Sequence, residues 1–169
     1  MGFWRCALYI AVLGAAMFLL GRVLPKRWFR WYVFPYQDFR FERRGRIYDR
    51  LGIRFWQKRA PDMSRLFRRL MPPKKLSGDL EIANLRLMLQ ETCVAEFTHW
   101  VLSILGLWCI RLWREQGWLF WLVYFLLGNL PFILIQRYNR PRLASLLQRL
   151  ERRAAKAAAE ERTETLCES

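Results

Sequence analysis

Residues 118–135 read WLFWLVYFLLGNLPFILI, an apolar run that contains no charged side chain. A run of this kind is long enough to cross the roughly 30 Å hydrocarbon core of a bilayer as one helix. Two further apolar runs precede it, at about residues 6–24 and 93–112. We therefore predict an all-α, small integral membrane protein with about three transmembrane helices, at about 6–24, 93–112 and 118–136.

The overall composition supports this class of protein. Of the 169 residues, 54% are hydrophobic and 16% are aromatic, and the 9 Trp match the aromatic belts found at membrane interfaces. The length suits one membrane domain, residues 1–169. The first run resembles a signal peptide, but only Arg5 precedes it and apolar residues continue beyond its small-residue patch. We therefore expect it to remain as an uncleaved anchor.

Basic residues are distributed unevenly between the three runs. Lys and Arg crowd the predicted loop of residues 25–92 and the tail of residues 137–169, whereas the connection between the second and third runs holds only Arg111 and Arg114. The positive-inside rule then places the N-terminus outside and both the loop and the C-terminus in the cytoplasm. We expect a multi-pass protein of the cell (inner) membrane.

The net charge of +15 also restricts the partners. No motif that reads nucleic acid accompanies the basic residues, so we predict no nucleic-acid partner. Anionic membrane lipids explain most of the charge, and the phosphates of a coenzyme or an acidic carrier protein are the alternative. Aromatic and basic residues interleave between Lys26 and Phe41, which favours the headgroup layer. A basic stripe at four-residue spacing then predicts an interfacial amphipathic helix: Arg46, Arg50, Arg54 and Lys58.

The second apolar run opens with two carboxylates and the only histidine of the chain, between Glu91 and Trp100. Ionisable groups at membrane depth are costly and usually functional. We predict that this helix begins near residues 77–79 and continues to about Trp113. Thr92, Glu96 and His99 then share one of its faces. Because a short hairpin forces the next span to lie antiparallel, its Asn129 should lie within about one turn of His99.

This cluster suits the transfer of a group to a hydroxyl. His99 would act as the general base, with Glu96, or alternatively Glu91, orienting its ring, and an amide of Asn129 or Gln136 would stabilise an oxyanion. The predicted catalytic residues are His99, Glu96, Glu91 and Asn129. The predicted substrate-binding residues, with the arginines suited to phosphate, are Thr92, Gln136, Arg137, Asn139, Arg140 and Arg54. The alternative is that these polar groups only join two helices.

Three ordered blocks of the sequence resemble one known family: residues 46–56, residues 91–100, and residues 129–131 with 136–142. This is the family of the glycosyl-4,4'-diaponeurosporenoate acyltransferases. The resemblance implies a membrane acyltransferase that esterifies a sugar hydroxyl of a glycosylated carotenoid with a fatty acyl chain. The implied partners are a lipophilic glycoside acceptor and an acyl donor, either acyl-CoA or an acyl carrier protein. No cofactor and no metal are expected.

A non-enzymatic membrane adaptor is the competing class of function. Its polar cluster would be an assembly interface, and its basic loop would dock a partner. A homo-oligomer is possible under either function. The tail after Arg142 is expected to form an amphipathic helix through Leu150 and to be frayed from Glu160 onward. The four cysteines show neither disulfide nor metal spacing.

Overall fold

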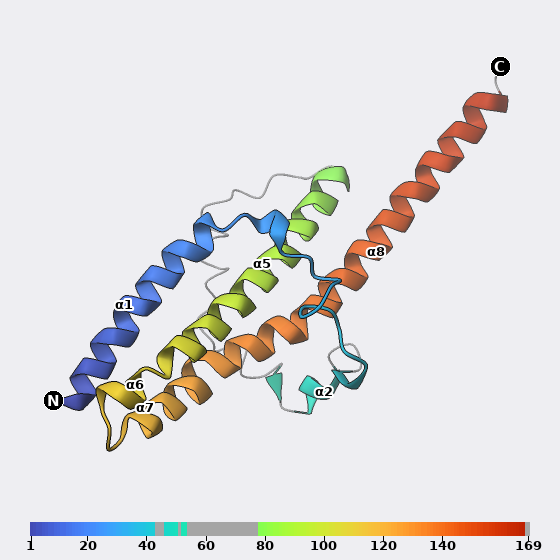
Figure 1. Cartoon of the computed structure of the whole chain (residues 1–169). Coiled ribbons are helices and arrows are strands. Elements are labelled where there is room, and N and C mark those ends of the chain that lie inside the picture. Colours follow the sequence, from blue (N-terminus) through green and yellow to red (C-terminus); the bar gives the residue numbers. More distant parts are fainter. Residues whose placement is uncertain (43–45, 51, 54–77, 168–169) are drawn as a thin grey trace.

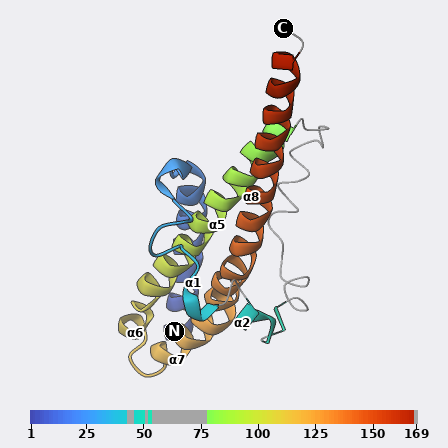
Figure 2. The same ribbon diagram turned by 90° about the vertical axis from the view of Figure 1, so that its right-hand side faces the viewer.

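The computed structural model describes residues 1–42, 46–50, 52–53 and 78–167. None of these ranges forms a strand, so the predicted all-α class is confirmed for the part of the chain that the structure describes. Three long helices lie side by side in both views (Figures 1 and 2). They are α1 (Gly2–Val23), α5 (Gly78–Gly106) and α8 (Leu130–Cys167).

Shorter helical segments connect the long helices. Three of them lie between α1 and α5: η1 (Lys26–Trp28), η2 (Arg40–Glu42) and α2 (Arg46–Asp49). The other three lie between α5 and α8: α6 (Cys109–Leu112), α7 (Gly117–Val123) and the π-helical turn η3 (Tyr124–Asn129). The π-turn ends two residues before Pro131, which has no N–H to donate to the carbonyl one α-helical turn earlier.

Three helical stretches are long and apolar enough to cross a membrane: Gly2–Val23, Glu81–Leu112 and Gly117–Glu160. The predicted number of about three helices able to cross a membrane is therefore confirmed, and the second and third stretches extend beyond the apolar runs that marked them. Large apolar side chains on α1, such as Leu8, Val12 and Leu19, remain exposed in the isolated chain. A helix of this kind is stable when lipid covers that surface.

The N-terminus of α1 lies at the same end of the bundle as the α6–α7 hairpin (Figure 1). The Tyr9 hydroxyl donates to the Leu105 carbonyl at 2.9 Å, and the Phe3 ring contacts the Trp113 ring edge to face. At its other end α1 packs on α5, where a Cβ on Gly21 would lie 3.4 Å from the Thr98 methyl. The helices α1 and α5 are therefore antiparallel, as the predicted topology requires.

The α6–α7 hairpin is tight because Gly117 lies directly against the preceding helix. Its N–H donates to the Trp113 carbonyl at 2.6 Å, and a Cβ on Gly117 would lie 2.1 Å from the Cys109 carbonyl oxygen. No side chain fits there. The predicted short antiparallel connection is confirmed, but the helix expected to continue to about Trp113 instead ends at Gly106, and α6 follows after a turn.

The contact between α5 and α8 is the most extensive in the described part of the chain. Far from the hairpin it is apolar, with Leu85 and Leu89 packed on Leu147. Beyond this contact α8 continues alone as a single helix to Cys167 (Figure 2). The tail was expected to fray from Glu160 onward, but the helix continues from Glu160 to Cys167. The Ala-rich segment after Arg153 consists of strong helix formers.

The segment after α1 folds back across α5 and α8 instead of extending away from them. We call residues 29–42 the strap. Phe29 is buried against Cys93 and Val94 of α5. After the strap, α2 ends at Asp49, and Gly52 adopts a left-handed φ of 64° that stops the predicted amphipathic helix. The remainder of that predicted helix, with Arg54 and Lys58, lies outside the described residues.

Candidate active site

His99 of α5 and Asn129 of η3 contact each other across the helix pair. His99 Nδ1 lies 3.0 Å from Asn129 Oδ1. The imidazole is also stacked on the Phe132 ring, with centroids 4.9 Å apart and planes 3° from parallel. The predicted proximity of His99 and Asn129 is therefore confirmed. The ring is held on one edge by the amide and on one face by the phenyl group.

The π-turn determines which end of the Asn129 amide meets the imidazole. Asn129 Nδ2 lies 3.5 Å from the Tyr124 carbonyl, at the outer limit of a hydrogen bond. A carbonyl only accepts, so it faces the amide nitrogen and leaves Oδ1 toward His99. Nδ1 must then carry the proton and donate it, which leaves Nε2 as the basic nitrogen. Among the described residues Nε2 has no hydrogen-bond partner.

The structure gives Asn129 and Glu96 contacts other than the predicted ones. Asn129 was predicted to donate to an oxyanion; its Oδ1 meets His99 and one of its two Nδ2–H groups faces the Tyr124 carbonyl, so that role stays a prediction. Its contact makes it the group that orients the imidazole. Glu96 was predicted to have that orienting role, but its carboxylate turns away from His99. We call His99 and Asn129 the dyad.

Glu96 is instead at the centre of a buried ion-pair network between α5 and α8. Its Oε1 accepts from Arg137 Nε at 2.8 Å, and its Oε2 accepts from Arg140 Nη2 at 2.6 Å. Glu96 is 1% exposed and Arg140 is 4% exposed. Two guanidinium groups surround one carboxylate, so a second acid is needed to balance the charge.

Glu42, at the end of the strap, supplies that second acid. Its Oε1 accepts from Arg137 Nη1 at 2.9 Å and from the Tyr48 hydroxyl, and its Oε2 accepts from the Phe39 N–H at 2.9 Å. Burial alone raises the pKa of Glu42, but these hydrogen bonds and the charge of Arg137 outweigh burial and lower it. We call Glu42, Glu96, Arg137 and Arg140 the lattice.

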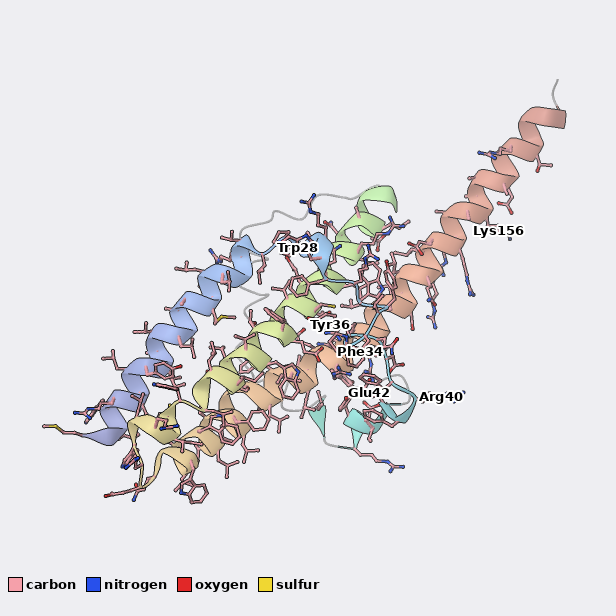
Figure 3. The ribbon with its side chains drawn as sticks, viewed as in Figure 1. Trp28, Phe34, Tyr36, Arg40, Glu42 and Lys156 are labelled. Atoms are coloured by element: carbon pink, nitrogen blue, oxygen red, sulfur yellow. The ribbon has the colours of Figure 1, made fainter. Side chains whose placement is uncertain are left out.

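The arginines of the lattice also bind the strap backbone. Arg137 Nη2 donates to the Pro35 carbonyl at 2.7 Å, and Arg140 Nη1 donates to the Tyr36 carbonyl at 2.9 Å. Figure 3 shows Phe34, Tyr36 and Glu42 along the strap where it crosses the α8 ribbon. The lattice therefore joins three parts of the chain: α5, α8 and the strap.

Arg137 and Arg140, predicted to bind phosphate, make extensive contacts within the protein. All three guanidinium nitrogens of each residue donate to protein oxygens. Thr92, predicted to bind substrate, accepts from Arg140 Nε at 3.0 Å and donates to the Leu89 carbonyl at 2.7 Å. These three residues therefore have structural contacts, and their substrate-binding roles stay predictions.

The dyad and the lattice both lie within the stretch that comparison with known proteins identifies. Residues 25–149 match the family model described as glycosyl-4,4'-diaponeurosporenoate acyltransferase. The chain belongs to this family. The predicted family and enzyme class, acyltransferase, are therefore confirmed, and the competing adaptor class loses its support.

Curated relatives from Staphylococcus aureus carry the family name. The protein of strain MRSA252, named glycosyl-4,4'-diaponeurosporenoate acyltransferase, is 30% identical over 88% of this chain and 89% of its own length. The protein of strain bovine RF122 / ET3-1 has the same name, identity and coverage. No solved structure matches the chain.

The other predicted residues of this acyltransferase are placed as follows. Glu91 forms an ion pair with Lys26 at the surface, so it does not contact His99. Gln136 and Asn139 are half-buried on α8, and their substrate-binding roles stay predictions. Arg54 lies outside the described residues. No group of three potential metal ligands occurs in the part of the chain that the structure describes, and the expected lack of a metal stays a prediction.

Sequence reasoning missed Glu42 and Phe132. Glu42 is one of only two acids between Lys26 and Arg46, so a rare carboxylate in a basic segment was the available signal. Phe132 gave no signal, because one aromatic side chain in an apolar span looks like any other. Stacking on the imidazole gives it a role that only the structure reveals.

Proposed function

We propose that this protein transfers a fatty acyl group from a cytoplasmic thioester donor to a sugar hydroxyl of a glycosylated lipid, at the cytoplasmic leaflet. The dyad is the observation that carries this proposal: a membrane-embedded imidazole with its Nδ1 held by an amide and its Nε2 open. The name of the relatives supports a carotenoid glycoside as the acceptor. Acyl-CoA and acyl carrier protein are the two donors considered.

In the proposed mechanism, Nε2 of His99 removes the proton of the sugar hydroxyl as its oxygen attacks the thioester carbonyl carbon. Asn129 keeps the imidazole in the required tautomer and accepts from Nδ1–H while the ring is charged. The tetrahedral intermediate then expels the thiolate, which takes the proton back from the imidazolium. Ester and free thiol result. Gln136 or the second Nδ2–H of Asn129 is the candidate donor to the oxyanion.

The charge distribution supports the cytoplasmic leaflet. The N-terminus and the α6–α7 hairpin share one end of the bundle and carry few basic residues, whereas the strap side carries many. The positive-inside rule assigns the strap side to the cytoplasm. His99 lies nearer that side than the hairpin, so the acyl chain of a cytosolic donor and a glycolipid can both approach Nε2 from the lipid side.

The test is acyl transfer by the purified protein in liposomes that contain a glycosylated carotenoid, with acyl-CoA or acyl carrier protein supplied outside. We expect His99→Gln to lower the rate by about 10²–10⁴-fold, because a positioned general base contributes that much. Lys26→Gln, at an exposed ion pair, is the matched control and should retain the rate. Undiminished transfer by His99→Gln would remove the histidine from the mechanism.

A further inference from the structure

The lattice and the strap together close the α5–α8 seam on the side of His99 away from the hairpin. Glu96 precedes His99 by less than one turn of α5, and its carboxylate is bonded to both arginines. Glu42, Glu96 and Arg140 are each less than 5% exposed. Phe29 of the strap covers another face of α5, with its ring 5.7 Å from that of Phe97.

A lattice of charged groups is an unusual way to close a seam. Buried ion pairs add little stability over apolar residues of the same volume, so packing alone does not account for two arginines and two glutamates here. A guanidinium does what an apolar side chain does not: its fork bonds a helix carboxylate and a strap carbonyl at the same time. Arg137 and Arg140 both do this, at the consecutive carbonyls of Pro35 and Tyr36.

We infer that the strap, held by Arg137 and Glu42, is a water seal over the His99 site, so that the acyl group passes to a sugar hydroxyl and not to water. This inference rests on the proposed acyl transfer. A base that activates a sugar hydroxyl activates water equally well. Attack by water forms the same carbonyl bond, breaks the same C–S bond, and releases free fatty acid and thiol. Excluding water is therefore what makes the site a transferase.

In this inference Arg137 and Glu42 are positioning residues that act through the strap. They do not contact the reacting atoms. Their loss should change the fate of the acyl group more than the rate at which the thioester is consumed. A residue with only a structural role would lower both products together.

Cys93 is a natural reporter of the seal. It is 0% exposed, it lies under Phe29 with Tyr36 packed beside it, and its thiol donates to the Leu89 carbonyl. Opening of the strap would expose this thiol to a water-soluble maleimide. Labelling of Cys93, measured by mass spectrometry of its peptide, therefore reports the seal without depending on any substrate.

The experiment compares Arg137→Lys and Glu42→Gln with Arg86→Lys in liposomes. Arg86 is the matched control. It lies on α5 and forms an ion pair with Glu151 of α8 at 2.7 Å, so it joins the same two helices, but at the surface. Acyl ester and free fatty acid are measured from one acyl-thioester, together with the rate of Cys93 labelling. Lysine keeps the charge of Arg137 but lacks the fork, and glutamine keeps the shape of Glu42 without its charge.

We expect both lattice variants to raise the ratio of free fatty acid to ester at least about tenfold and to speed Cys93 labelling by a similar factor, because local opening becomes more frequent. Arg86→Lys should change neither. An unchanged product ratio overturns the inference, whether or not Cys93 becomes labelled. A wild-type protein that forms no ester contradicts the proposed function instead, and Cys93 labelling then still decides whether the lattice holds the strap closed.

Discussion

The dyad and the lattice lie less than one turn apart on α5, and they differ in how completely their polar atoms are used. In the lattice every carboxylate oxygen and every guanidinium nitrogen has a protein partner. In the dyad, Nε2 of His99 has none among the described residues. A buried network in which every polar atom is hydrogen-bonded holds the chain segments in place. An oriented imidazole with one unbonded nitrogen can instead accept a proton from a substrate.

The largest expected effect is on stability, from Glu96→Ala. This change leaves Arg140 buried without a carboxylate and Arg137 with only Glu42, and breaking a buried ion pair from one side costs about 3–5 kcal/mol. Unfolding titrations in mixed micelles would measure it. His99→Ala should lose less, about 1–3 kcal/mol, because it leaves the buried Asn129 Oδ1 without its partner. Equal losses in both variants would erase the distinction between lattice and dyad.

Asn129 provides the next test, on the rate of transfer. Asn129→Ala removes the acceptor of Nδ1–H, and an unsatisfied buried group costs about 1–3 kcal/mol, so the rate should fall about 10–100-fold. Asn129→Asp keeps an acceptor toward Nδ1 and should retain more of the rate than Asn129→Ala. If the two variants are equally slow, Asn129 does not act by orienting the imidazole.

The pH dependence of Cys93 labelling should report on the lattice. The pKa of Glu42 is lower in the folded protein than its ordinary 4.5, so its stabilising contribution is complete above that value and is lost as the pH falls through the folded pKa. Cys93 should therefore stay protected down to about pH 4.5. Labelling of Cys93 that already rises well above pH 4.5 would contradict the role of the Glu42 carboxylate in holding the strap.

Glu91→Gln should have the smallest effect. Its carboxylate pairs with Lys26 at the surface, where its side chain is 52% exposed. Exposed ion pairs contribute about 0–1 kcal/mol, so both the unfolding free energy and the rate should remain near those of the wild type. A loss as large as that of Glu96→Ala would show that Glu91 has a partner other than Lys26.

The sequence was sufficient to predict features that depend only on position along a helix. Hydropathy and length predicted the three spans, and the depth of His99 and Asn129 in antiparallel helices predicted that they would be close. It was less accurate at helix ends. The α5 helix ends at Gly106 and two turn residues separate it from α6, whereas α8 continues to Cys167 because its alanines favour the helix.

The ion-pair partners of the buried glutamates could not be predicted in the same way. Glu96 shares a helix face with His99, so either the imidazole or a distant arginine could have been its partner. Arginine side chains reach across more than a helical turn, and depth along the helix therefore does not select among them. Glu42 is separated from Arg137 by 95 residues of sequence, and no pattern in either segment links them.

The π-turn η3 holds one more residue than an α-helical turn of the same height. Every side chain after it is rotated by about 100° from where an unbroken helix would place it. Phe132, Arg137 and Arg140 all lie downstream. Deleting one residue from Tyr124–Asn129 would thus turn all three side chains away from α5 together. The one extra residue of the π-turn therefore determines that Phe132, Arg137 and Arg140 face their partners on α5.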